Sequence, residues 1–204
     1  MKLIYSAGGY AREFRRLIPL QYPGEEILLI DDTPGEGDLT YQEALAHPAR
    51  GEAEIVIGFA NSTLRQRKTE QALADGFALY SVYANTAVIA EDAAIGPGSV
   101  ISDFSIVTPD VRIGQGFHSN MYGYVAHDSV LGDFVTLAPR ASINGRVEVA
   151  DHVYFGTGAS VLPGQPGKPM RIGEGAVIGA HALVTQDVPA GATMIGVPAR
   201  PIER

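Results

Sequence analysis

Apolar residues recur at every sixth position through the second half of the chain, from Ile89 to Val161. Ser119 is the only polar member of this series. After an interruption the spacing resumes at Ile172, Ile178, Val184 and Ala190. An α-helix repeats its faces about every 3.6 residues and a strand about every 2, so neither accounts for this period. The pattern predicts a solenoid of short flat strands, each with one side chain pointing inward.

Dipeptides at the expected corners indicate that three six-residue units make one coil of eighteen residues. Ile-Gly, Leu-Gly, Val-Ala and Ala-Gly pairs begin at these positions: Ile95, Ile113, Leu131, Val149, then Ile172 and Ala190. All are eighteen residues apart except Val149 and Ile172, which are twenty-three apart. The sequence therefore predicts a five-residue insertion within residues 163–170, and its proline and glycine content indicates a loop. Residues eighteen apart should stack on neighbouring coils about 4.8 Å apart.

The first eighty residues show a different pattern, in which apolar runs alternate with helical ones. We expect strands at 2–6, 26–30 and 54–59, and helices at 12–20, 41–46 and 63–74. Asn61-Ser62 is a predicted N-cap and Gly76 a predicted helix stop. Alternation of this kind is typical of parallel βαβ units, here long enough for a mononucleotide. The predicted fold is an α/β Rossmann-like domain over residues 1–82, followed by an all-β domain, a left-handed parallel β-helix of hexapeptide repeats, over 83–204.

Composition excludes several classes of function. The net charge is −8 and no Lys/Arg run is present, which argues against a nucleic-acid partner. The chain has no cysteine, so a disulfide, a thiolate metal site and a cysteine nucleophile are all excluded. No apolar run approaches the roughly 18 residues of a membrane span, and the start lacks a signal-peptide pattern. We therefore expect a cytoplasmic protein with no membrane partner.

Polar and glycine residues gather at the predicted carboxyl edge of the first sheet. Gly8 and Gly9 form a strand-to-helix turn that would let the backbone approach a phosphate. Asp31 and Asp32 end the second strand, where carboxylates could accept from ribose or base donors. At the third strand the candidates are Asn61 and Arg65, the latter as a partner for a diphosphate. Each has a plain alternative, a ligand-free turn or a solvated side chain, but their convergence favours a nucleotide site.

One histidine of the β-helix stands out. His118, His127, His152 and His181 fall in different columns, which argues against a zinc site shared between coils. We expect His152 and His181 at the surface. His127 has Asp128 beside it and Gly145 one coil later. Such a group could act as a general base, with the carboxylate orienting the imidazole and a glycine N–H facing an oxyanion. The alternative is a solvated turn histidine.

The whole chain resembles a known family. Residues VAHDSVLGDFVTLAP in the middle and VPAGATMIGVPARPI near the end, after a small nucleotide-binding domain, are similar to the bacterial nucleotide-sugar N-acetyltransferases and the related sialic-acid O-acetyltransferases. The resemblance implies a homotrimer that uses acetyl-CoA without a metal, with active sites between adjacent β-helices.

The resemblance also implies roles for single residues. His127 matches the general base, Asp128 its acidic partner and Gly145 the donor to the thioester oxygen. Asn120 matches a residue near the acceptor sugar. The nucleotide-sugar contacts would be Gly8, Gly9, Tyr10, Asp31, Asp32, Asn61 and Arg65. The CoA contacts would be Thr136, Gly156, Thr157, Gly179, Ala180 and Arg200. Tyr10 and Thr136 stand where relatives can have histidine, and the inserted loop is a further departure. There we hypothesise that Lys168 or Arg171 meets CoA phosphates.

The expected reaction is acetylation of the amine of a UDP- or GDP-linked dideoxy amino sugar for bacterial surface glycans. Direct attack on the thioester needs no covalent enzyme intermediate. The alternatives are O-acetylation of sialic acid or another sugar, a non-catalytic nucleotide-sugar-binding trimer, and a zinc-dependent hydratase. The sequence names neither the base, nor the sugar, nor the glycan pathway.

Overall fold

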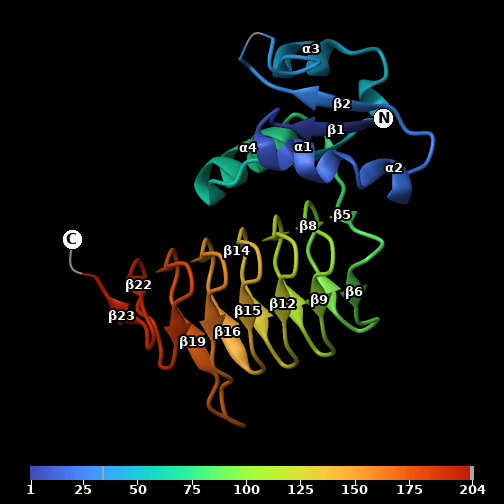
Figure 1. The fold of residues 1–204 in the computed structure, drawn as a ribbon. Coiled ribbons are helices and arrows are strands. Elements are labelled where there is room, and N and C mark those ends of the chain that lie inside the picture. The colour runs from blue at the N-terminus through green and yellow to red at the C-terminus, as the bar shows by residue number, and fades with distance from the viewer. Residues whose placement is uncertain (34, 203–204) are drawn as a thin grey trace.

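A computed structural model describes residues 1–33 and 35–202, in which an α/β layer lies over one side of a three-sided parallel β-helix (Figure 1). The first sheet has the order β2-β1-β3-β4 and is parallel throughout, as the alternating pattern predicts. Its strands are β1 (Lys2–Tyr5), β2 (Ile27–Ile30), β3 (Glu54–Ile57) and β4 (Ala78–Leu79). Its helices are α1 (Gly9–Arg15), α2 (Ile18–Gln21), α3 (Tyr41–Ala46), η1 (Arg50–Glu52, a 3-10 turn) and α4 (Ser62–Ala74).

The helix expected over residues 12–20 is wrong in its bounds, because two helices occupy this stretch. Pro19 lies in the first turn of α2, where a missing N–H is tolerated, and it could not continue α1. The predicted cap of α4 is confirmed: the Asn61 side chain accepts the Leu64 N–H at 2.8 Å. Gly76, with φ of +85°, ends that helix as expected.

The β-helix consists of three parallel sheets. We name one for the α/β layer that covers it and the other two for the residues on their outer faces. The covered sheet contains β5 (Val82–Tyr83), β8 (Val100–Ile101), β11 (His118–Ser119), β14 (Thr136–Leu137), β17 (Tyr154–Phe155), β20 (Val177–Ile178), β22 (Thr193–Ile195) and β23 (Arg200–Pro201), the last antiparallel. The charged sheet contains β7 (Ala94–Ile95), β10 (Arg112–Ile113), β13 (Val130–Leu131), β16 (Val147–Val149) and β19 (Met170–Ile172). The apolar sheet contains β6 (Val88–Ile89), β9 (Ile106–Val107), β12 (Tyr124–Val125), β15 (Ser142–Ile143), β18 (Ser160–Val161) and β21 (Leu183–Val184).

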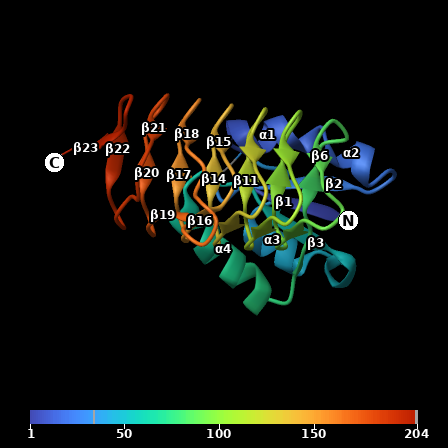
Figure 2. The same cartoon turned by 90° about the horizontal axis from the view of Figure 1, so that it is seen from below.

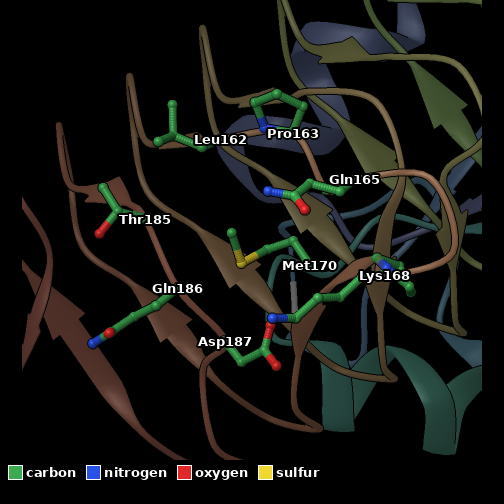
Figure 3. Close-up of a pocket in the computed structure, with 10 residues that line it drawn as sticks. Leu162, Pro163, Gln165, Lys168, Met170, Thr185, Gln186 and Asp187 are labelled. Atoms are coloured by element: carbon green, nitrogen blue, oxygen red, sulfur yellow. The ribbon is translucent and has the colours of Figure 1, made fainter.

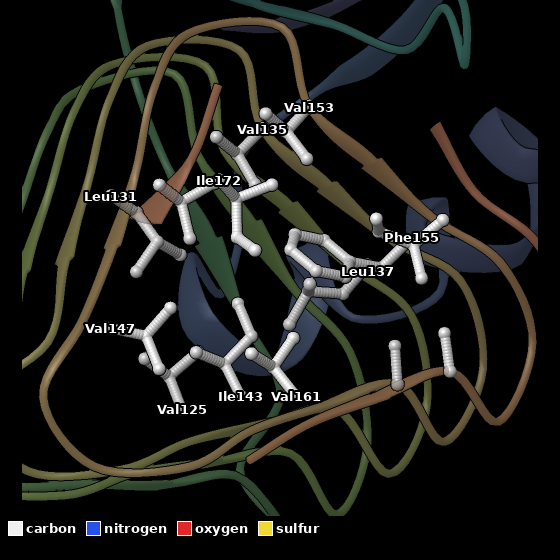
Figure 4. Packing of buried hydrophobic residues seen from close by; sticks show 14 of the residues in the cluster. Val125, Leu131, Val135, Leu137, Ile143, Val147, Val153, Phe155, Val161 and Ile172 are labelled. Atoms are coloured by element: carbon white, nitrogen blue, oxygen red, sulfur yellow. The ribbon is translucent and has the colours of Figure 1, made fainter. Parts of the chain in front are cut away.

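The eighteen-residue register is confirmed through most of the β-helix. Ile113 pairs with Ile95 and with Leu131, and Val149 pairs with Ile172 across the insertion. The inward series forms a continuous core along the axis (Figure 4). Ser119 is buried in it, and its hydroxyl is satisfied by Ser105 at 3.2 Å.

The last coil departs from the expected count. Ile172 bridges to Val188, and Ile178 pairs with Met194, so this coil has sixteen residues instead of eighteen. Ala190 is therefore exposed and does not continue the inward series. Val188, 3% exposed, takes that place, because the larger side chain buries more apolar surface.

The three outer faces have different surroundings (Figure 2). On the covered sheet Val100, His118 and Thr136 are buried beneath the α/β layer. On the charged sheet the outward residues include Arg112, Glu148 and Arg171, all exposed. On the apolar sheet the outward residues are Val88, Ile106, Tyr124, Ser142, Ser160 and Leu183, partly or fully exposed. This last face is apolar or small and carries no charge, although no part of the described chain covers it.

Candidate active site

His127 and Asp128 lie on the edge where β12 turns into β13, which we call the base edge. His127 Nδ1 is 2.8 Å from Asp128 Oδ2, and both side chains are about half exposed. The hydrogen bond from His127 lowers the pKa of Asp128 from its ordinary value. Asp128 has φ of +59°, a left-handed conformation that aspartate tolerates better than most residues. The predicted pair is therefore present: Nδ1 contacts Asp128, and Nε2 has no hydrogen-bond partner among residues 1–33 and 35–202.

Gly145 packs against the imidazole from the next coil, as the column count predicts. A Cβ at this position would lie 2.6 Å from His127 Cε1 and 2.7 Å from Nε2, so only glycine leaves room for the ring. The Gly145 N–H makes no hydrogen bond to the described part of the chain. An imidazole and a backbone N–H with no partner in the described residues thus lie side by side, an arrangement that suits acyl transfer.

Arg146 was not singled out by the sequence reasoning. Its guanidinium is 3.3 Å from the same Asp128 Oδ2 that contacts His127. The signal was available, because Arg146 follows Asp128 by eighteen residues and so stacks on it.

A groove of about 590 Å³ continues along the base edge beyond Gly145 (Figure 3). The inserted loop forms one wall, folded back by paired backbone hydrogen bonds between Gln165 and Lys168. The groove is lined by apolar and amide side chains and by Lys168 and Asp187. Arg171 is not among its lining residues and instead pairs with Glu148 at 2.9 Å. Of the two basic residues proposed for CoA, only Lys168 therefore faces the groove.

The expected pantetheine contacts lie on a different edge, between the covered and apolar sheets, which we call the donor edge. Gly156 packs tightly on Gly179 and Ala180, since a Cβ on Gly156 would lie 2.6 Å from Ala180 N. Thr157 and Ala180 are exposed beside them. This confirms the predicted stacking of the segments. One chain does not bring them to His127, however, because the strands of the apolar sheet separate the two edges. Arg200 is exposed on β23, near the end of the β-helix.

A crevice of about 310 Å³ separates α1 from the β-helix and collects several predicted contacts from both parts of the chain. Its lining includes Gly9, Tyr10, Asn120, Thr136 and Thr157. At its base the rings of Tyr10 and fully buried His118 are 5.1 Å apart. Burial, helped by the charge of Arg65, holds the pKa of His118 well below its usual range.

The two aspartates at the end of β2 are held by the protein itself. Asp31 accepts the Ala7 N–H at 3.0 Å and so fixes the turn that leads into Gly8, the N-cap of α1. Asp32 accepts from the Tyr5 hydroxyl at 2.6 Å, and this bond lowers the pKa of Asp32. Lys68, which the sequence reasoning missed, lies 3.6 Å from the same carboxylate.

The structure contradicts the expectation that Arg65 binds a diphosphate. Arg65 is 0% exposed, and burial lowers the pKa of Arg65 to about 10. All five of its N–H donors are used within the protein. The acceptors are the carbonyl groups of Phe59, Ala60, Gly116 and Phe134 and the hydroxyl of Thr136. Arg65 joins the α/β layer to the β-helix, and Thr136, 4% exposed, serves that contact as well.

The remaining histidines differ in exposure. His181 is exposed, as expected, whereas His152 is half-buried and stacks on Phe134 with ring centroids 5.5 Å apart. Within residues 1–33 and 35–202, no three His, Cys, Asp or Glu residues are grouped so that they could hold a metal ion. In the same residues no helix is long and apolar enough to cross a bilayer.

Comparison with known proteins gives consistent results, although no protein-family model matches the chain. GDP-perosamine N-acetyltransferase of Escherichia coli O157:H7 is 36% identical over 98% of this chain and 96% of its own. WeeI from Acinetobacter baumannii AYE superposes with a TM-score of 0.94 at 38% identity, over 99% of both chains. PerB from Caulobacter crescentus, solved with CoA and GDP-perosamine, superposes with a TM-score of 0.90 at 25% identity, over 99% of this chain and 97% of its own.

Proposed function

The chain belongs to the bacterial nucleotide-sugar N-acetyltransferases of the hexapeptide-repeat superfamily, and we propose that it acetylates the amine of a nucleotide-linked dideoxy amino sugar with acetyl-CoA. The observation that carries the proposal is the contact of His127, Asp128 and Gly145 on one edge of the β-helix. Relatives named for GDP-perosamine favour a GDP-linked acceptor. The product would enter a surface glycan, and we place the reaction in the cytoplasm.

In the proposed mechanism the sugar amine attacks the carbonyl carbon of the thioester directly. His127 Nε2 takes the amine proton as the C–N bond forms, and Asp128 holds the ring through Nδ1. The Gly145 N–H donates to the developing oxyanion. The C–S bond then breaks, and the CoA thiolate leaves and receives the proton from the imidazolium. No covalent enzyme intermediate forms.

We further propose that two copies of the chain complete each site. The base edge and the donor edge both border the apolar sheet, whose uncharged outer face suits burial against another copy. In a ring of three, the base edge of one copy adjoins the donor edge of the next. His127 then faces the Thr157 and Ala180 wall of its neighbour, with acetyl-CoA between them. The apolar sheet would form the trimer interface.

Under this proposal residues 1–82 form a Rossmann-like domain that holds the nucleotide. Gly8, Gly9, Asp31 and Asp32 line its sheet edge, while Tyr10 and Asn120 face the sugar across the crevice. Asn61, the cap of α4, lies at the same edge. Residues 83–204 form a left-handed β-helix that carries the acetyl donor, with Lys168 near its phosphates.

The test follows free thiol release from acetyl-CoA with a panel of GDP-, UDP- and dTDP-linked amino sugars and their hydroxyl analogues. We expect release with an amino sugar, and a loss of about 10²–10⁴ in kcat for His127→Ala. The matched control is His47→Ala, a histidine far from the site in sequence. Turnover of only the hydroxyl acceptors would favour O-acetylation, and no release with any acceptor would favour a binding protein. A His127→Ala variant with near wild-type turnover would falsify the assignment of the base.

A further inference from the structure

The base edge carries a run of aspartates that ends at an arginine. Asp92, Asp110 and Asp128 occupy the same corner of three successive coils, each three residues after an inward residue of the apolar sheet. Arg146 has this corner position on the next coil, with φ of +60° against +59° for Asp128. The charge at this corner therefore changes sign immediately after the base.

Arg146 is fixed at its backbone on both sides. Its N–H donates to the His127 carbonyl at 3.0 Å, and its own carbonyl accepts the Met170 N–H at 3.1 Å. The side chain reaches back to Asp128 Oδ2 at 3.3 Å. One carboxylate oxygen is thus shared between the imidazole and the guanidinium, which limits how the carboxylate can rotate.

We propose that Arg146 is a positioning residue for the base, which orients the Asp128 carboxylate toward His127 Nδ1 and offsets part of its negative charge. The role rests on the proposed function of His127. Because the imidazole and the guanidinium hold the same carboxylate oxygen, Oδ2 stays beside Nδ1 and the ring proton is kept on that nitrogen. Nε2 is then the nitrogen that can accept the amine proton.

The direct test is long-range 1H–15N NMR of the histidine rings in the full-length protein at about pH 8.5, with the His127 signal assigned by its loss in His127→Ala. This measurement needs no substrate, so it remains valid if the proposed reaction is wrong. We expect His127 mainly as the tautomer with its proton on Nδ1, and we expect the fraction of that tautomer to fall in Arg146→Met. Arg146→Lys, which keeps the charge, should restore most of the difference. In Arg146→Met, kcat should fall by about tenfold or more with KM unchanged.

Two further variants serve as controls. Arg112→Met removes an exposed arginine from the charged sheet and should leave the His127 tautomer unchanged. Arg146→Asn suits the left-handed backbone and should lower the fraction of the Nδ1–H tautomer as Arg146→Met does. If Arg146→Met and Arg146→Asn both keep the tautomer of the unsubstituted protein, the proposal is overturned. That holds also if their KM rises, because Arg146 would then contact a substrate and would not position the base.

Discussion

Substitution of Gly145 by alanine tests the spacing between the two coils that build the site. The added methyl group would lie 2.6 Å from His127 Cε1, whereas ordinary van der Waals contact begins at 3.4 Å. The imidazole must therefore retreat by nearly 1 Å or rotate away from Asp128. Gly145 does not have the positive φ that disfavours side chains, so the backbone itself accepts alanine. The perturbation is thus confined to the position of the ring.

The expected result is a large loss of activity with little loss of stability. A misplacement of about 1 Å costs roughly 10² in rate, and complete loss of the base costs up to about 10⁴, so kcat should fall within that range. His127 is 51% exposed and can move into solvent, so the free energy of unfolding should change by less than about 1 kcal/mol.

The assay pairs thiol release under saturating substrates with urea denaturation. Gly51→Ala is the matched control, because nothing lies within 4 Å of its added Cβ. A Gly145→Ala variant with kcat within about threefold of the unsubstituted protein would refute the close packing of glycine on the base. A large loss of stability would instead mean that the ring cannot move as argued.

Two other predictions concern the contact between the α/β layer and the β-helix. Arg65→Met leaves the buried carbonyl groups of Gly116 and Phe134 without this donor, and each unsatisfied group costs about 1–3 kcal/mol, so urea denaturation should show a loss of about 2–6 kcal/mol; a loss below about 1 kcal/mol would contradict the role of Arg65 as a link. His118 stays neutral in the fold because its pKa is held well below its usual range, while the unfolded chain takes up a proton below about pH 6.5. Stability should therefore fall as pH drops below that value, by up to about 1.4 kcal/mol per pH unit from this residue, and His118→Phe should remove that part of the slope. Equal slopes for both proteins between pH 6.5 and 5 would exclude this source.

Counting along the chain located His127 against Gly145 because the β-helix repeats its register with little variation. The same count failed at Ala190, where the last coil loses two residues and Val188 supplies the buried side chain. A local pattern cannot reveal such a shortening. Val188 and Ala190 are both apolar, and only the pairing of Val188 with Ile172 on the neighbouring coil decides which of the two is buried.

Arg65 was misassigned for a different reason. The sequence correctly places it in the first turn of α4, near the edge of a parallel sheet where ligands commonly bind. What lies opposite that edge depends on how the α/β layer is seated on the β-helix. In the fold the carbonyl groups of Gly116 and Phe134 face the guanidinium, although they are 51 and 69 residues away in sequence. Periodicity carries no information about a contact of this kind.

The position of each group along the β-helix axis gives the site a direction. Tyr10 of the α/β layer packs on His118, and Asn120 and His127 belong to the same coil as His118. Under the proposed function the acceptor sugar, held from the α/β layer, would therefore be level with His127. Gly145 lies one coil further on, and the Thr157 and Ala180 wall and the groove beside Lys168 lie further still toward the C-terminus. An acetyl donor that lies along these coils would present its thioester at Gly145, so acceptor and donor would meet from opposite directions at the coil that carries His127.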